Sequence, residues 1–131
     1  MPVLDTCFVI DFLRGDPGAV RLLTLLQQGS RPLGITAHTE FELFAGIGRS
    51  RQPDADKQPL ESFLAELVRF PFTSEAARTA GLLEAQLASK GQRPAILDLL
   101  IGCTALHAGE PVVTRDRNPF QSIPGLEVLA Y

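Results

Sequence analysis

Short apolar runs alternate with helical segments along the whole chain, and this alternation limits the possible folds more than any other feature. Each run is bounded by proline, glycine or polar residues, as strands are. Buried parallel strands need no polar alternation, so continuous apolar runs fit a parallel sheet that helices cover on both faces. The sequence therefore predicts an α/β fold, a three-layer α/β/α sandwich with a five-stranded, mostly parallel sheet. The predicted strands lie at residues 1–4, 32–36, 69–72, 112–114 and 126–129.

Between these runs, apolar residues recur at helical spacing. Thr6 and Thr39 stand near the starts of two helical segments and are predicted to cap them. Pro94 is predicted to lie in the first turn of another helix, where proline is favoured. The polar stretch 49–59 indicates an exposed loop or the start of a helix. We expect helices over residues 7–13, 18–28, 39 to about 49, 60–68, 74–89 and 94–107.

Length and composition are those of an ordinary globular protein. The chain has 131 residues, of which 45 % are hydrophobic and 21 % are charged, which predicts a single domain over residues 1–131. Cys7 and Cys103 both lie among apolar residues, as buried free thiols do in a reducing compartment. The first residues do not have the pattern of a signal peptide, and no apolar stretch reaches the roughly 20 residues that a membrane span needs. We therefore expect a cytoplasmic protein with no membrane association.

Four carboxylates stand next to apolar segments, where an ionised group is costly unless it is paired. Asp5 and Asp116 each follow a predicted strand, at the edge of a parallel sheet where ligands gather. Glu42 and Asp98 lie on predicted helices that begin near the same edge. The sequence therefore predicts that the four acids meet at the carboxyl ends of the strands.

Acids that converge in this way need a cation. Two carboxylates about 4 Å apart repel by roughly 4 kcal/mol at an effective dielectric constant of about 20. Oxygen ligands suit a hard divalent ion, so Mg²⁺ or Mn²⁺ is the predicted cofactor. Such an ion can activate water for attack on a phosphodiester, and a second ion about 3.5–4 Å away can hold the leaving oxygen. The net charge of −3 argues against binding nucleic acid through bulk positive charge but does not exclude such a nuclease.

Four segments of the sequence are similar to one known family when they are taken together. They are VLDTCFVIDFLRG, ITAHTEFELFAGIGR, PAILDLLIGCTALHAG and VVTRDRNPFQSIPGLEV, in this order. In this order and spacing they resemble the PIN-domain family, and within it the VapC toxins of toxin–antitoxin pairs. The resemblance covers nearly the whole chain. It implies catalytic, metal-binding acids at the four positions named above, with Thr6 and Thr114 beside them to orient ligands or water.

The resemblance also implies an activity and partners. It predicts a Mg²⁺- or Mn²⁺-dependent endoribonuclease that cleaves structured RNA, such as tRNA or rRNA, and so inhibits translation. It predicts a cognate VapB-like antitoxin that covers the active site, and a homodimer. Arg115 and Arg117 are candidates for RNA contacts because they flank Asp116.

Two residues depart from the family's pattern. Pro119 stands where the closing motif often has another acid, which weakens a second metal site. Gly102 stands where alanine is usual, and we expect this to cost helix propensity by up to about 1 kcal/mol without affecting the chemistry.

Several alternatives for single residues remain open from the sequence. Glu40 competes with Glu42 for the second acidic position, but it lies on a different face of the predicted helix. Asp11 and Asp16 are interpreted as surface or capping acids. Thr6 and Thr114 have capping as an alternative role.

Two alternative functions also remain. One is a PIN-type nuclease in RNA processing that has no antitoxin. The other is a non-catalytic, Mg²⁺-binding α/β module of the receiver type, which expects a lysine late in the chain. No lysine follows Lys90, which counts against the receiver-like module.

Overall fold

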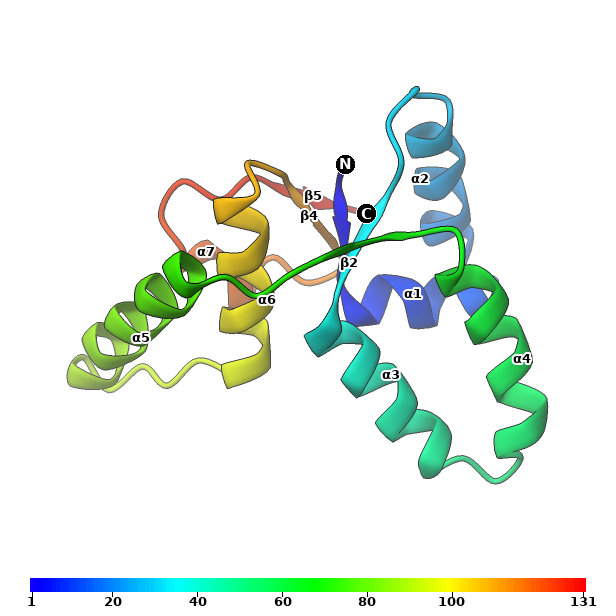
Figure 1. Ribbon diagram of the computed structural model, residues 1–131, viewed down its shortest axis with the longest axis horizontal. Coiled ribbons are helices and arrows are strands. Elements are labelled where there is room, and N and C mark those ends of the chain that lie inside the picture. The colour runs from blue at the N-terminus through cyan, green and yellow to red at the C-terminus, as the bar shows by residue number, and fades with distance from the viewer.

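The computed structural model describes residues 1–131 and contains one five-stranded sheet with helices on both faces (Figure 1). The strand order is β3-β2-β1-β4-β5, and every neighbouring pair is parallel. The predicted three-layer α/β fold is therefore confirmed, and the sheet is parallel throughout. The strands are β1 (Val3–Leu4), β2 (Gly34–Thr36), β3 (Val68–Phe70), β4 (Val112–Thr114) and β5 (Val128–Ala130).

Successive residues of the strands enter different cores, as the two-residue period of a strand requires. Val3 and Val112 belong to the core beneath α5 (Ser74–Ser89), α6 (Ile96–His107) and α7 (Asn118–Gln121). Leu4 and Val113 belong to the core on the other face. That face is covered by α1 (Thr6–Leu13), α2 (Pro17–Gln27), α3 (Ala37–Gly48) and α4 (Pro53–Leu64).

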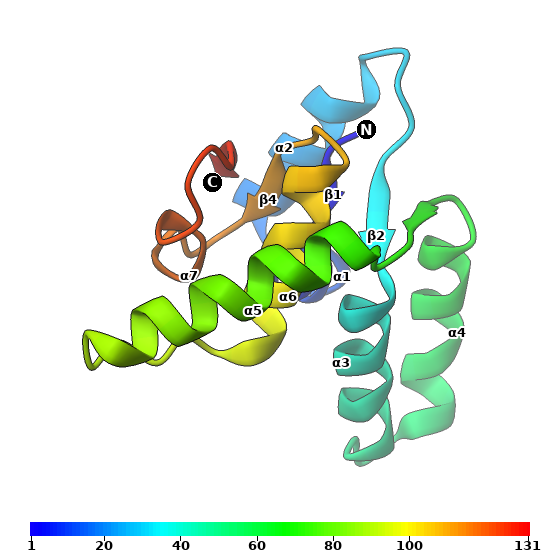
Figure 2. The same cartoon turned by 60° about the vertical axis from the view of Figure 1, so that its left-hand side comes forward.

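Parallel pairing brings the carboxyl ends of β1 and β4 to the same edge of the sheet. Val3 pairs with Val112, and Leu4 pairs with Val113. The residues that follow these strands therefore begin side by side. Figures 1 and 2 show α3 extending beyond this edge from β2, with α4 running back beside it.

Glycine permits a close approach at one point in the sheet. A Cβ atom on Gly34 of β2 would lie 2.2 Å from the ring of Phe70, which lies on the neighbouring strand β3. The ring therefore lies across β2 only because residue 34 has no side chain.

Some boundaries differ from the sequence-based expectations. Helix α4 occupies most of the stretch interpreted as a loop or helix start, and α7 was not expected. Strand β3 begins at Val68, which the sequence placed in a helix. Thr36 caps α3 by accepting a hydrogen bond from the Thr39 amide, so the prediction that Thr39 is the cap was wrong. Asp5 occupies the N-cap position of α1, and Thr6 is already in the helix.

No helix in the structure has both the length and the apolar character needed to cross a membrane.

Candidate active site

The four predicted acids line one cavity at the carboxyl edge of the sheet. Its volume is about 300 Å³. Asp5 and Asp116 follow β1 and β4, Glu42 lies on α3, and Asp98 lies in the first turn of α6. Segments far apart in the sequence thus each contribute one carboxylate. The lining residues are Asp5, Thr6, Cys7, Ile10, Glu42, Asp98, Thr114, Arg115, Asp116 and Pro119.

Asp5 is the most enclosed of these acids, with 6 % of its surface exposed. Its Oδ2 atom accepts hydrogen bonds from Thr114 Oγ1 at 2.9 Å and from Cys7 Sγ at 3.4 Å. Its Oδ1 atom is buried and has no hydrogen-bond partner. Burial raises the pKa of Asp5, and the Thr114 hydrogen bond opposes that rise. An unpaired, buried carboxylate oxygen is costly, and a cation would satisfy it.

Glu42 is held by a threonine from another helix. Thr6 Oγ1 donates a hydrogen bond to Glu42 Oε1 at 2.6 Å, which ties α1 to α3 at the cavity. The rival acid, Glu40, instead forms an ion pair with Arg69 at 3.0 Å and does not line the cavity. Of the two glutamates, only Glu42 belongs to the site geometry.

Asp98 is the acid whose pKa responds to all three of the others. Its pKa is raised to about 6, first by burial and then by the charges of Asp5, Glu42 and Asp116. Each of the other three acids therefore acts on Asp98 through space, in the way that carboxylates sharing a site do. Perturbed carboxylates in a cleft are common at functional sites.

The carboxylates form an open arrangement. No group of three or more histidine, cysteine, aspartate or glutamate side chains is placed to hold a metal ion in the present conformation. The donors are nevertheless of the hard oxygen type that Mg²⁺ and Mn²⁺ prefer, and Asp5 Oδ1 lacks a partner. The residues therefore fit such an ion in the chemistry of their oxygen donors, and holding one requires the carboxylates to move from their present positions.

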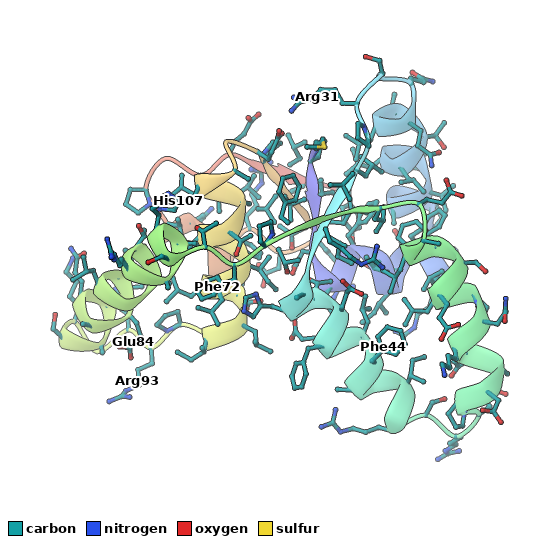
Figure 3. The ribbon with its side chains drawn as sticks, viewed as in Figure 1. Arg31, Phe44, Phe72, Glu84, Arg93 and His107 are labelled. Carbon is teal, nitrogen blue, oxygen red and sulfur yellow. The ribbon has the colours of Figure 1, made fainter.

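Histidine takes no part in this cavity. His107 lies at the opposite end of α6 from Asp98 and is hydrogen-bonded to Thr79 at 2.8 Å (Figure 3). His38 stacks edge-on against Phe72, with 5.0 Å between ring centroids. The site chemistry therefore depends on carboxylates.

The PIN-domain family profile matches residues 3–126 of the chain. The chain belongs to the PIN-domain family. Ribonuclease VapC19 from Mycobacterium tuberculosis is 29 % identical to it over 127 residues, which cover 97 % of this chain and 98 % of the relative. The tRNA(fMet)-specific endonuclease VapC from Shigella flexneri is 28 % identical over 124 residues, which cover 95 % and 92 % of the two chains.

Solved structures share the fold of this PIN domain over nearly its whole length. The crystal structure of DNA-bound VapBC from Salmonella typhimurium matches with a TM-score of 0.83 and 30 % identity, covering 98 % of this chain and 97 % of that one. The structure of VapBC2 from Rickettsia felis bound to a promoter DNA fragment matches with a TM-score of 0.86. At 24 % identity, with the same shares covered, this second likeness shows the fold alone.

Two residues on α1 of this PIN domain have partners that the sequence did not reveal. Cys7 is only half-buried, and its thiol donates to Asp5. The interpretation of Asp11 as a surface or capping acid was wrong, because Asp11 is buried and binds both Arg115 and Tyr131. The sequence held one signal for the position of Asp11: it lies one helical turn after Cys7 and so shares a face of α1 with that residue.

The two departures from the family's pattern have structural consequences. Pro119 lines the cavity, where its ring adds no charge. Gly102 does more than weaken a helix, because a Cβ atom there would lie 2.3 Å from Ile123 Cδ1. The absence of a side chain on α6 lets the segment after α7 pack directly against it.

Proposed function

We propose that this PIN domain is a Mg²⁺- or Mn²⁺-dependent endoribonuclease and the toxin of a VapBC-type toxin–antitoxin pair. It would cleave structured RNA, such as tRNA or rRNA, and so inhibit translation. The observation that carries the proposal is the convergence of four carboxylates from separate elements on one cavity, with the pKa of Asp98 raised to about 6. Relatives named as ribonucleases and as a tRNA(fMet)-specific endonuclease support the choice of RNA.

Each residue then has a defined task. Asp5, Glu42, Asp98 and Asp116 would hold the cation. When bound, a divalent ion supplies the Lewis acid that phosphodiester hydrolysis needs. Thr114 keeps Asp5 Oδ2 in place, and Thr6 does the same for Glu42 Oε1. These hydrogen bonds limit side-chain rotation, as groups behind a metal ligand usually do.

The protonation of Asp98 links the site to pH. With a pKa of about 6, Asp98 is partly protonated in mildly acidic solution and must release that proton to act as an anionic ligand. Cation binding to the site is therefore expected to weaken as the pH falls from 7 toward 5.

Substrate contacts are proposed for the two arginines that flank Asp116. The Arg115 side chain is 60 % exposed and lines the cavity. Arg117 is also exposed. Guanidinium groups bind phosphate oxygens well, so these two side chains are the candidates for holding the RNA backbone.

A protein partner is proposed for a groove that adjoins the acidic cavity. The groove has a volume of about 320 Å³ and shares Ile10 and Glu42 with the cavity. Leu13, Leu43 and Ile47 give it apolar walls. A VapB-like antitoxin bound there would cover Glu42, and the VapBC complexes among the structural relatives support this partner.

The homodimer also remains part of the proposal. Phe41 on α3 is 64 % exposed, and Ile96 at the start of α6 is 53 % exposed. A second copy of the chain that covered these two side chains would remove their apolar surface from water. Arg93 lies near Ile96 in the sequence and projects away from the ribbon (Figure 3).

Cleavage assays with paired variants test the nuclease proposal. The purified wild-type protein is incubated with total tRNA and rRNA with Mg²⁺, with Mn²⁺ and with EDTA. We expect metal-dependent cleavage that Asp98→Asn and Glu42→Gln each reduce at least about 100-fold, in the range seen when groups that stabilise a transition state are removed.

Glu40→Gln is the matched control, because it alters the same side-chain type two residues away on α3, outside the cavity. It should cleave like the wild type. Cleavage at the wild-type rate by Asp98→Asn, or undiminished cleavage in EDTA, would contradict the proposal. Growth arrest on expression, relieved by co-expression of the antitoxin, separates the toxin from an RNA-processing nuclease.

A further inference from the structure

Asp11 is a buried carboxylate outside the cavity, and it is completely paired. Only 8 % of its surface is exposed. Arg115 Nη1 donates to both of its oxygens, each at 2.9 Å, and the Tyr131 hydroxyl donates to Oδ2 at 2.6 Å. A buried carboxylate is tolerated when charge-assisted hydrogen bonds of this kind satisfy it.

These hydrogen bonds join three segments that are distant in sequence. Asp11 lies on α1, Arg115 lies directly after β4, and Tyr131 lies directly after β5. The Tyr131 ring packs edge-on against Phe8, with ring centroids 5.4 Å apart, so its hydroxyl is anchored by the core beneath α1. Asp11 is therefore held in a fixed position from which it can restrain Arg115.

The restrained residue lies next to one of the site acids. Asp116 lies outside the helices and strands, in the short connection between β4 and α7. Its amide donates to Thr114 Oγ1 at 3.2 Å, and its Oδ1 accepts from the Asn118 amide at 3.0 Å. The first contact anchors Asp116 to the end of β4 and the second is local to the connection, so neither fixes its placement relative to α1 and β5.

Two longer tethers fix that placement, one on each side of Asp116. The Arg115 side chain reaches Asp11 on α1, and its amide donates to Cys7 Sγ at 3.4 Å. On the other side, Arg117 Nη1 donates to the Val128 carbonyl oxygen on β5 at 3.3 Å. The stronger tether is the one to Asp11, because it is ionic and uses both carboxylate oxygens.

We propose that Asp11 and Tyr131 are positioning residues that act through Arg115 to hold Asp116 at the acidic cavity. Neither residue lines the cavity, so neither touches the reacting groups. The inference rests on the role proposed above for Asp116. Loss of the tether would leave the connection freer, and the fourth carboxylate would spend less time in place.

Hydrogen–deuterium exchange on the metal-free protein tests the tether directly. We compare the wild type with Asp11→Asn, which keeps the size of the side chain and removes its charge. The expected result is faster exchange at the Arg115 and Asp116 amides in Asp11→Asn. Tyr131→Phe should produce a smaller change in the same direction, because it removes one of the three hydrogen bonds to Asp11.

Asp16→Asn is the matched control. Asp16 caps α2 by accepting the Ala19 amide at 2.9 Å and takes no part in the tether. Asparagine caps helices nearly as well as aspartate does, so the exchange of the Arg115 and Asp116 amides should stay at the wild-type rate. Thermal melts of each variant confirm that exchange is compared between folded proteins.

RNA kinetics then separate positioning from substrate contact. For Asp11→Asn we expect kcat to fall by about 10- to 100-fold, as misplacement of a catalytic group does, with a smaller change in KM for RNA because Arg115 itself remains. Asp11→Glu, which restores the charge, should recover part of the loss. The Asp116 amide should exchange no faster in the double variant Asp11→Asn/Arg115→Gln than in Arg115→Gln alone, because both substitutions remove the same contact.

The inference is overturned if the Arg115 and Asp116 amides of Asp11→Asn exchange at the wild-type rate. A raised KM with unchanged kcat also overturns it, because Arg115 would then serve RNA binding without positioning Asp116. If the wild-type protein cleaves no RNA, the proposed function fails, but exchange in the metal-free protein still decides whether the tether exists.

Discussion

The two ends of the sheet each bury a carboxylate, and their chemistry is opposite. At the amino edge, Glu110 is 9 % exposed and is paired with both the Met1 ammonium group and Arg31. The hydrogen bond from that ammonium group, followed by the nearby positive charges, lowers the pKa of Glu110. At the carboxyl edge, Asp5 is 6 % exposed, forms no ion pair with a basic side chain, and has a raised pKa.

The two acids differ in what they do for the folded protein. An acid with its own cations stabilises the native state and is chemically quiet. An acid whose pKa is raised by burial and by a neighbouring acid destabilises the folded, metal-free state at neutral pH, and such perturbed acids are common at functional sites. Burial is the largest cause of the raised pKa of Asp5, whereas hydrogen bonding and positive charge outweigh burial at Glu110, so desolvation and the supply of cations together make the difference.

Removing the paired acid should give the largest change in stability. Glu110→Gln leaves the Met1 ammonium group and Arg31 without their anion, and we expect a loss of about 1–3 kcal/mol in the free energy of unfolding at pH 7. Urea denaturation measures it. The loss should fade as the pH falls from 4.5, the ordinary pKa of a glutamate, through the lowered pKa of Glu110. It fades because the wild-type carboxylate then also becomes protonated and loses its ion pairs. An equal loss at low pH would show that packing is responsible.

Removing an unpaired acid should instead raise the free energy of unfolding. Asp98 has its pKa raised from 3.8 to about 6, so the folded wild type holds a proton that the unfolded chain releases. Its stability therefore falls as the pH rises from about 4 to above 6. In metal-free buffer at pH 7 we expect Asp98→Asn to be more stable by about 1–2 kcal/mol, after allowance for partial solvent screening.

Thermal melts at two pH values check this prediction for Asp98. The gain should be present at pH 7 and absent near pH 3.5, where the wild-type side chain is protonated. Destabilisation of the metal-free protein by Asp98→Asn at pH 7 would contradict the proposed repulsion among the acids.

An exposed acid with a partner should matter least. Glu40 and Arg69 form an ion pair at the surface, with the two side chains 25 % and 50 % exposed. Such pairs contribute about 0.2–1 kcal/mol, so Glu40→Gln should lower stability by less than about 1 kcal/mol. The loss should disappear in 1 M salt, which screens exposed charges. Urea denaturation at two salt concentrations provides the measurement.

The sequence predicted the sheet well because the signal for each strand is local. Short runs such as 112–114 are apolar and are bounded by turn residues, which specifies a buried parallel strand. Helix α4 was harder to recognise, because Pro59 lies inside it and only Leu60 and Leu64 are buried. Helix α7 spans only Asn118–Gln121, too short for a periodic pattern.

The acids of the site were likewise predictable, and their partners were not. Asp5 and Asp116 follow strands whose carboxyl ends must meet in a parallel sheet. The contact between Asp11 and Tyr131 spans 120 residues and depends on how β5 ends beside α1. No local sequence pattern indicates a contact between residues so far apart. The buried, paired Asp11 was therefore interpreted as a surface or capping acid.

Calorimetric titration of Mn²⁺ into the metal-free protein at pH 7 shows whether the four acids form a cation site. We expect the wild type to bind the ion and Glu110→Gln, at the other edge, to bind it equally well. Asp5→Asn and Asp98→Asn should each weaken binding at least about tenfold, as loss of a charged ligand does. Undiminished binding by Asp5→Asn and Asp98→Asn, or no binding by the wild type, would show that these acids do not form a cation site.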